Sequence, residues 1–320
     1  MKISVTIPAY KEQYLKECID SVLCQSYSDF ELIIVNDASP YNLDDIIAQY
    51  NDPRIRYYKN EVGFGGLNVV GNWNKCLEYA HGDFVICMGD DDRLLPNCLE
   101  DYTALIDKYP NLDVYHMRTE MIDEHSNLID IQVPAPEHES VYELIWNIWK
   151  GRDQYIGDFL FRTKALKDKG GFFNLPYAWS SDKISVFMAA AKDGIANTYI
   201  PGFQYRKSTI TITNTCTNQR ERYDALFQEK QWYHNFFAQL PVPTDGIEKK
   251  YLCLLKDNVD KYMDSRLESM LYWDVTDTPS HYKYWKENKD KYSISDRTLK
   301  HARFIYVKEK LRSTLKLIGL

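Results

Sequence analysis

Hydrophobic and polar positions alternate in blocks along the first 90 residues. Short apolar runs that predict buried strands are separated by stretches in which apolar residues recur every three or four positions, as in amphipathic helices. The expected strands are Ile3–Ile7, Phe30–Val35, Arg54–Tyr58 and Asp83–Met88. The expected helices lie around residues 15–23, 43–50 and 69–80. This alternation predicts an α/β fold, a Rossmann-like and mainly parallel sheet with helices on both faces.

Polar clusters follow three of these strands. They are Tyr10 and Glu12 after the first strand, Asn36-Asp37 after the second, and Asp90-Asp91-Asp92 after the fourth. In a doubly wound sheet the carboxyl ends of the parallel strands open on one edge, where ligands bind. We therefore expect a nucleotide-binding crevice along this edge.

The acidic triplet at residues 90–92 is a candidate metal site. Adjacent carboxylates repel one another, and their hard oxygen donors suit Mg²⁺ or Mn²⁺, with a substrate phosphate completing the coordination. The alternative is an acidic turn in which Asp92 caps the helix expected after Pro96. The loop Gly63-Phe-Gly-Gly66 is neither a Walker loop nor a G-x-G-x-x-G sequence, which disfavours a kinase or a dehydrogenase.

The second half of the chain changes character near residue 215. Before it, strands are expected at Leu112–Met117 and Ile195–Ile200, a hairpin-like alternation at Met121–Val133, and a helix at Val141–Trp149. From about residue 219 the pattern is helical to the end.

Composition narrows the function classes. The 320 residues are 44% hydrophobic, which suits a globular protein with a real core, and the net charge of −7 argues against a nucleic-acid partner. The seven Cys form no C-x-x-C pair and read as reduced thiols. MKISVTIPAY leads directly into a strand without a signal peptide, and no 18-residue apolar run exists, so we expect a cytoplasmic protein.

Four blocks of sequence resemble the successive motifs of the family 2 glycosyltransferases with the GT-A fold. The blocks are Ile7-Pro-Ala-Tyr10, Val35-Asn-Asp-Ala-Ser39, Asn74-Lys-Cys-Leu-Glu-Tyr-Ala-His-Gly-Asp-Phe84 and Gly89-Asp-Asp-Asp-Arg-Leu-Leu-Pro96. Their order and spacing match over roughly residues 1–210. The resemblance implies a nucleotide-diphospho-sugar donor, a divalent metal held by a D-x-D motif, and inversion at the anomeric carbon.

The resemblance also assigns roles on the donor side. Pro8, Ala9, Tyr10 and Glu12 match the loop that borders base and ribose, Asp37 the acid that hydrogen-bonds the base, and Asn72 or Asn74 the helix that frames the nucleotide. Asp91 and Asp92 match the metal end of D-x-D, with Asp92 as the first candidate ligand, and either Asp90 or Asp91 faces the ribose. The chain departs from the family at Gly89, where many members carry the first Asp. By itself, Asp37 also fits an Asx-turn or a helix cap.

On the acceptor side, Asp182 matches the catalytic base, and Ser181 stands where Glu is common. A carboxylate there takes the proton of the acceptor hydroxyl as it attacks; the alternative is an ordinary first-turn acid. Arg206, in a Tyr-Arg pair typical of the family, either pairs with a phosphate or braces a carboxylate. Residues 208–217 resemble a segment that folds over the donor.

The last helix, beginning near Ser295, is basic and amphipathic. Phe304, Val307, Leu311, Leu315 and Ile318 lie on one side, among Lys and Arg residues. Such a helix either lies on an anionic membrane surface or docks on the protein with a solvated basic face.

The resemblance therefore implies a glycosyltransferase that moves a sugar, most simply from a UDP-sugar, to a glycan or lipid-linked acceptor in bacterial surface polysaccharide synthesis. Residues 1–215 would be the GT-A catalytic domain, with a nucleotide-sugar half at 1–110 and an acceptor half at 111–215, and residues 216–320 a helical extension. A sugar-nucleotide nucleotidyltransferase usually has a Gly-rich basic loop where this chain has Ile7–Glu12. A non-catalytic glycan-binding relative is disfavoured by the intact acid cluster.

Overall fold

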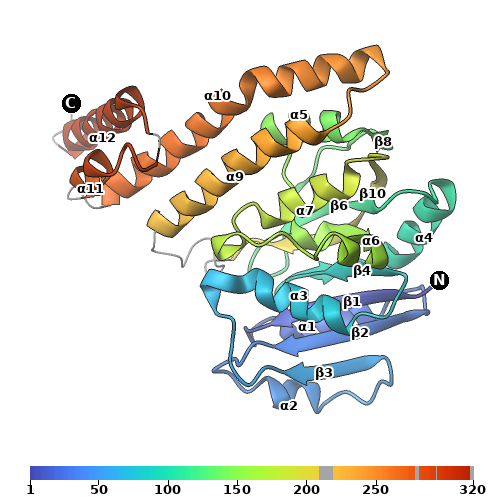
Figure 1. Ribbon diagram of the computed structural model, residues 1–320. Coiled ribbons are helices and arrows are strands. Elements are labelled where there is room, and N and C mark those ends of the chain that lie inside the picture. The colour runs from blue at the N-terminus through green and yellow to red at the C-terminus, as the bar shows by residue number, and fades with distance from the viewer. Residues whose placement is uncertain (209–218, 278–280, 293, 318–320) are drawn as a thin grey trace. The chain divides into compact units, whose positions relative to one another are not determined.

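The computed structural model describes residues 1–208, 219–277, 281–292 and 294–317. Its elements are labelled in Figure 1. The chain divides into two compact units, of which the first comprises Met1–Cys216 with Pro243–Tyr251 and the second Thr217–Val242 with Leu252–Leu320.

The first unit is built on a ten-stranded mixed sheet, which confirms the predicted α/β class. The strands are β1 (Ile3–Ala9), β2 (Phe30–Asn36), β3 (Ile55–Lys59), β4 (Phe84–Cys87), β5 (Arg93–Leu94), β6 (Val114–Ile122), β7 (Leu128–Ile131), β8 (His138–Glu139), β9 (Phe159–Arg162) and β10 (Ile195–Arg206). Their order is β3-β2-β1-β4-β9-β6-β10-β5, with β7 on β6 and β8 on β10. The pairs β1–β2, β1–β4, β2–β3 and β6–β10 are parallel.

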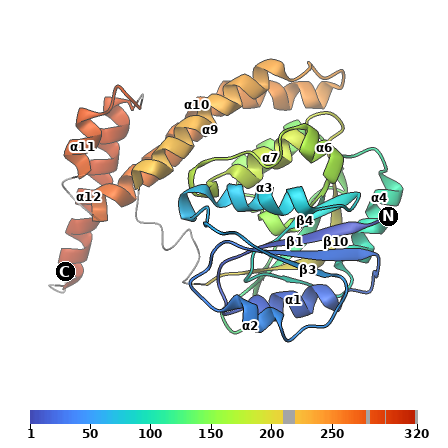
Figure 2. The same cartoon turned by 60° about the horizontal axis from the view of Figure 1, so that its bottom comes forward.

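Helices cover both faces of this sheet. They are α1 (Leu15–Leu23), α2 (Leu43–Ile47), α3 (Val69–Tyr79), α4 (Cys98–Lys108), α5 (Val141–Trp149), α6 (Thr163–Asp168) and α7 (Ser181–Ala190), with 3₁₀ turns η1 (Gly66–Asn68), η2 (Ile156–Asp158) and η3 (Pro176–Ala178). Figure 2 shows α3 and α7 on one face and α1 and α2 on the other. Because both faces are covered, β2 is buried along its whole length, as its mainly apolar sequence predicts.

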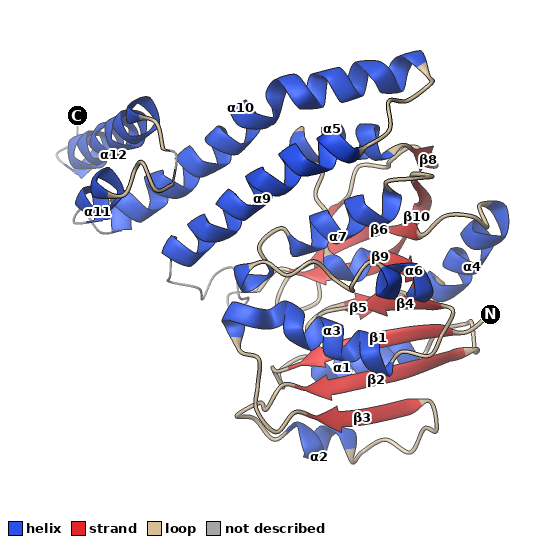
Figure 3. Cartoon of the chain, in the orientation of Figure 1, coloured by secondary structure: helices blue, strands red, loops and turns tan. Residues whose placement is uncertain are grey.

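The parallel strands bring their carboxyl ends to one edge. Figure 3 shows the arrowheads of β1, β2 and β3 at the same side of the sheet. The register pairs Ala9 with Asn36, and Thr6 with Cys87, so the turns after β1, β2 and β4 are neighbours. The three polar clusters of the sequence therefore lie together.

Two of the elements that differ from the pattern-based predictions lie next to the acid cluster. The strand predicted at residues 195–200 continues to Arg206, because β10 bulges between Asn197 and Phe203 and resumes its pairing with β6 beyond the bulge. The two-residue strand β5 was not predicted, since it consists only of a pairing between Arg93-Leu94 and Phe203-Gln204. Both features carry the end of β10 to the acid cluster.

The second unit is helical. It contains α9 (Gln219–Gln239), most of α10 (Gly246–Asp277), α11 (His281–Glu287) and α12 (Asp296–Leu317). Its core is aromatic, with Tyr223 packed against Trp285 and Tyr292 at ring-centroid distances of 4.8 and 4.5 Å. Among the described residues, none of the helices combines the length and the apolar character that crossing a bilayer requires.

Candidate active site

Asp90 joins the turns after β1 and β4. The chain leaves β4 at Cys87, and the three carboxylates that follow Gly89 are all buried. Oδ2 of Asp90 accepts hydrogen bonds from the backbone N–H groups of Tyr10, at 2.8 Å, and Lys11, at 2.7 Å. Because its lone pairs hold this turn, Asp90 fixes the loop that borders the expected base and ribose site.

Lys11 is a member of the site that the sequence analysis missed. Its Nζ forms an ion pair with Asp91 and lies 3.3 Å from Oδ1 of Asp90. Burial would lower the pKa of the Lys11 ammonium, but the two carboxylates outweigh burial and raise that pKa. A lysine in the polar turn after the first strand was the only signal in the sequence.

The acid cluster carries more negative charge than Lys11 neutralises. Burial, and after it the Asp91 carboxylate, raises the pKa of Asp92 well above its ordinary value. Burial also raises the pKa of Asp90, against the opposing effect of Lys11. Three carboxylates facing one ammonium leave an electrostatic demand for a further cation.

Gly89 lets two carboxylates fold back over the chain. A Cβ at this position would lie 2.9 Å from Oδ1 of Asp91 and 2.9 Å from Oδ2 of Asp92, so a side chain here would collide with both. Gly89, where the chain departs from the family pattern, thus leaves both oxygens in this position. Neither oxygen accepts a hydrogen bond from the residues that the structure describes.

These two oxygens suit a divalent cation. Mg²⁺ is commonly held by one or two carboxylates together with substrate phosphates and water. Within the described ranges no group of three or more His, Cys, Asp or Glu side chains is arranged to hold a metal. The residues thus fit an ion whose coordination is completed by a diphosphate, and not a closed protein-only cage.

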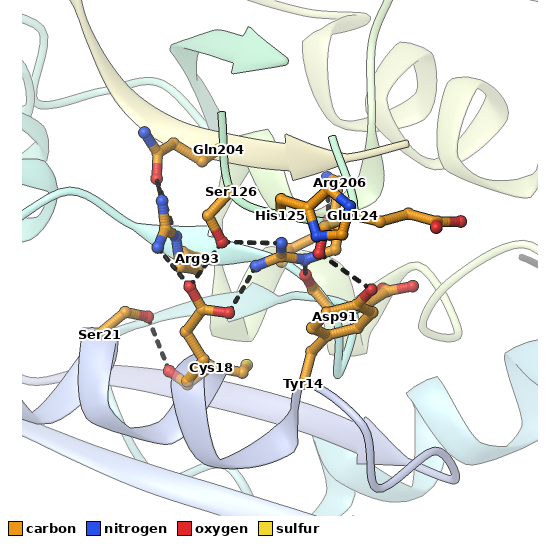
Figure 4. Close-up of polar contacts among 12 residues, drawn as sticks. Tyr14, Cys18, Ser21, Asp91, Arg93, Glu124, His125, Ser126, Gln204 and Arg206 are labelled. Atoms are coloured by element: carbon orange, nitrogen blue, oxygen red, sulfur yellow. Dashed lines mark hydrogen bonds and ion pairs between the residues drawn. The ribbon is translucent and has the colours of Figure 1, made fainter. Parts of the chain in front are cut away.

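Arg206 braces this cluster from behind. It is completely buried, and its backbone N–H donates to Oδ1 of Asp92 at 3.0 Å. Its guanidinium donates to the carbonyl oxygens of Asp91 and Asp123, to Ser126 and, at 2.8 Å, to Glu17. Figure 4 shows Arg206 next to Asp91 and Ser126. Every guanidinium nitrogen has a protein partner, which favours the bracing role over phosphate binding. Asp92 itself caps no helix, because its bonded oxygen receives this strand N–H.

Asp37 holds the Gly-rich loop after β3. Oδ1 accepts from Nδ2 of Asn60 and from the N–H of Phe64, both at 2.9 Å, and Oδ2 accepts from the N–H of Gly65 at 3.3 Å. Gly63 is required there, since a Cβ would lie 2.5 Å from the carbonyl oxygen of Asp37. The Asx-type bond expected as the alternative is made by the preceding residue, Asn36, which accepts from the N–H of Ser39.

The two candidate asparagines of α3 have different places. Asn72 is buried, donates to the carbonyl oxygen of Val35 and accepts from Asn60, so it lies behind Asp37 in the same cluster. Asn74 instead exchanges hydrogen bonds with the backbone of Phe172 at 2.8 and 3.1 Å. The structure thus brings Asn72 but not Asn74 to the polar cluster at the strand ends.

The other residues of the first loop lie beside this cluster. Ala9 is buried and its carbonyl oxygen accepts from the N–H of Asp37 at 2.9 Å. Pro8 is half-buried, whereas Tyr10 and Glu12 are exposed. Exposed side chains at the mouth of a polar cluster are available to a ligand.

Asp182 follows a strained stretch of backbone. It lies in the first turn of α7, after Tyr177, Ala178 and Ser180 with positive φ angles of 57°, 55° and 70°. Such conformations are unfavourable for residues other than glycine and are frequent at functional sites. Ser181, where the family commonly has Glu, is buried and its Oγ accepts from the N–H of Leu175 at 3.0 Å, so it supports this stretch.

Tyr205 connects the two ends of the candidate site. Burial raises its pKa to about 12, and the carboxylates of Asp92, Asp91 and, more weakly, Asp182 add to this effect. One phenol is therefore within electrostatic reach of both the candidate metal ligands and the candidate base. Its ring stacks on Tyr155 with centroids 3.8 Å apart, and paired rings of this kind are suited to packing against a sugar.

Residues 209–217 of the segment expected to fold over the donor lie outside the described residues.

One known protein family matches the first half of the chain. The sequence pattern of "Glycosyl transferase family 2" covers residues 4–168, slightly more than half of the 320 residues.

Individual relatives extend the match. A glycosyltransferase of Rickettsia typhi is 28% identical over 236 residues, covering 70% of this chain and 70% of that protein. The UDP-Glc:alpha-D-GlcNAc-diphosphoundecaprenol beta-1,3-glucosyltransferase WfgD of Escherichia coli is 30% identical over 229 residues, covering 70% and 85%. A protein assigned to colanic acid biosynthesis in Escherichia coli K12, WcaA, is 36% identical over 105 residues, covering 32% and 37%.

Solved structures share the fold. TarS 1–349 of S. aureus in complex with UDP-GlcNAc superposes with a TM-score of 0.64 at 18% identity, covering 85% of this chain and 81% of that chain. The mannosyltransferase PcManGT of Pyrobaculum calidifontis, in complex with GDP-Man and Mn²⁺, has a TM-score of 0.51 at 15% identity, covering 96% and 87%.

Proposed function

The chain belongs to glycosyl transferase family 2, and from this premise we propose that it transfers a sugar from a UDP-sugar to a lipid-linked or growing glycan with inversion. The activity of a nucleotide-sugar glycosyltransferase, class EC 2.4, with distant relatives in surface polysaccharide synthesis, follows from the family and its members. The observation that carries the proposal of a diphosphate donor is the pair of oxygens of Asp91 and Asp92 that converge on Gly89 after β4.

The donor would lie along the edge formed by the turns after β1, β2 and β4. Asp37, supported by Asn72, would offer a carboxylate oxygen to the base. The loop Pro8–Glu12 would border the ribose, and Asp90 would hold this loop in place. Asn74 is proposed only as a support of this region, because its amide is taken up by Phe172. Arg206 would keep Asp91 and Asp92 in place.

We propose that Asp91 and Asp92 hold Mn²⁺ or Mg²⁺ together with the donor diphosphate. A bound divalent cation neutralises the charge that develops on the leaving nucleoside diphosphate. The raised pKa of Asp92 supports this proposal, since a buried carboxylate with an unmet charge is stabilised by a cation.

Asp182 is proposed as the general base. The acceptor hydroxyl would attack the anomeric carbon as its proton passes to the Asp182 carboxylate, while the bond to the diphosphate breaks on the opposite face. Support comes from the position of Asp182 after the strained turn and from its effect on Tyr205, which also feels the acid cluster.

We extend the proposal to the domain organisation of the chain and to the location of its reaction in the cell. Residues 1–215 would form the catalytic domain, with the donor half at 1–110 and the acceptor half at 111–215, and residues 216–320 a helical extension. WfgD, whose name specifies a diphosphoundecaprenol acceptor, supports a lipid-linked acceptor and therefore a reaction at the cytoplasmic face of a membrane, with peripheral contact through the last helix.

The test is isothermal titration of UDP, GDP and dTDP with and without Mn²⁺. We expect one nucleotide to bind in a metal-dependent way, and Asp92→Asn to abolish the metal dependence. Asp130→Asn is the matched control, because this exposed acid of β7 accepts a hydrogen bond from the neighbouring N–H of Ile131 and lies outside the acid cluster. If the folded protein binds none of the nucleotides, the transferase proposal fails and a glycan-binding role takes its place.

A further inference from the structure

The last helix, α12, carries two apolar faces. Leu299 and Ala302 are buried, at 2% and 1% exposure, and attach the beginning of the helix to its own unit. Phe304, Val307 and Leu311 are 61%, 45% and 59% exposed. Their i, i+3, i+7 spacing places these three on one stripe, on the side away from the attached face. The stripe is therefore not the surface by which α12 packs within its own unit.

Basic side chains border this stripe. Among the described side chains of α12, the exposed basic ones are Arg297, Lys300, Arg303, Lys308, Lys310 and Arg312. Over its 22 residues α12 has seven Lys and Arg against two acids, a formal charge of +5 within a chain whose net charge is −7. At helical spacing, Lys308 and Arg312 flank the stripe on one side and Arg303 and Lys310 on the other. Long basic side chains on both flanks can keep their charges in water while their stems cover apolar surface.

A hollow lies at the beginning of the stripe. It has a volume of about 510 Å³ and is lined by Arg297, Lys300, His301 and Phe304. Two cationic side chains next to an exposed aromatic ring match the chemistry of a lipid phosphate above an acyl chain.

We propose that the stripe Phe304, Val307 and Leu311 with its basic flanks is a membrane-binding surface for anionic phospholipid. An exposed apolar stripe bordered by Lys and Arg is the arrangement of a helix that lies in the plane of a bilayer surface. A second copy of this chain is an unfavourable occupant of the stripe, because pairing two such stripes would bring two sets of basic flanks together, and their like charges repel. The inference deepens the proposed function, since a lipid-linked acceptor lies at the same surface.

The test is co-sedimentation of the full chain with vesicles of phosphatidylcholine alone and with about 30% phosphatidylglycerol. Because each basic residue near an anionic surface contributes roughly fivefold in binding, we expect at least tenfold stronger binding to the anionic vesicles, and a loss of that preference at high salt. Phe304→Ser combined with Leu311→Ser should lower binding at least tenfold. Lys308→Ser with Arg312→Ser should lower it only on anionic vesicles.

The matched control is Ile247→Ser with Lys250→Ser. These residues are an exposed apolar and an exposed basic position of α10 that belong to no such stripe, and their replacement should leave binding unchanged. Circular dichroism and melting temperature confirm that each variant is folded. Equal binding to both vesicle types, or binding unaffected by the stripe substitutions, overturns the proposal. Dimerisation or capture of an acidic protein that depends on the stripe, without vesicle binding, also overturns it.

The assay contains no donor and no acceptor. Failure of vesicle binding therefore leaves the transferase proposal standing, and failure of nucleotide binding leaves the membrane surface standing.

Discussion

Replacing Lys11 with methionine should strengthen metal binding in the absence of nucleotide. Lys11 competes with a cation for the charge of the acid cluster, since its Nζ pairs with Oδ2 of Asp91, whose other oxygen is a candidate metal ligand, and lies 3.3 Å from Oδ1 of Asp90. A divalent ion held by Asp91 must therefore share that carboxylate with an ammonium, or displace it. Methionine keeps much of the length and the apolar stem but removes the charge.

The expected change in metal affinity can be estimated from the ion pair between Lys11 and Asp90. Two unit charges at 3.3 Å attract by about 5 kcal/mol at an effective dielectric constant of about 20. Most of this attraction is offset when the displaced ammonium is hydrated again and its side chain regains conformational freedom. For this reason the net free energy of a partly exposed ion pair is far smaller than its Coulomb energy. A net change of about 1.4 to 2.8 kcal/mol remains, which corresponds to roughly 10- to 100-fold tighter binding of Mn²⁺.

Titration calorimetry and paramagnetic resonance of Mn²⁺, both without nucleotide, would measure the Mn²⁺ affinity of Lys11→Met and of the unmodified chain. The comparison belongs near pH 8, because removing Lys11 further raises the pKa of Asp90, and protons compete with the metal at lower pH. Lys16→Met is the control, since Lys16 is exposed and forms its ion pair with Asp20 on α1, outside the acid cluster. Equal or weaker Mn²⁺ binding by Lys11→Met than by the unmodified chain would show that the ammonium does not compete with a cation.

Four further predictions concern the same site. Asp182→Asn should lower kcat at least 100-fold with little change in nucleotide affinity, as loss of a general base requires; an unchanged kcat would remove Asp182 from that role. Gly89→Ala should weaken Mn²⁺ binding about tenfold with less than about 1 kcal/mol change in stability, because its Cβ drives the two carboxylate oxygens apart at little cost to the core; tighter binding would contradict this. Arg206→Met should cost about 3 kcal/mol in denaturant unfolding, since the buried network loses its central cation; a loss below about 1 kcal/mol would refute the bracing role. Because the folded pKa of Asp92 is raised, the folded chain holds a proton that the unfolded chain has lost. Stability should therefore fall as pH rises from the ordinary carboxyl pKa through the folded value, and Mn²⁺ should bind with proton release, seen as a buffer-dependent heat; no proton release above the ordinary carboxyl range would contradict it.

Local patterns determined much of this protein. The apolar runs predicted β1, β2 and β4 within two residues at each end, because a strand covered on both faces is mainly apolar. The same alternation of strands and helices placed three polar turns at one edge of a parallel sheet. The motif blocks around Asp37 and Asp92 were sufficient to indicate the family.

Tertiary structure decided which hydrogen bonds and ion pairs connect those turns. Lys11 meets Asp90 across 79 positions of sequence, and the N–H of Arg206 meets Asp92 across 114. Neither contact follows from periodicity, because both depend on strand order and register. The bulge in β10 shifts that register and brings Arg206 to the cluster. A pattern of apolar positions specifies which residues face the core, whereas which charges neutralise one another depends on distances that exist only after the strands have paired.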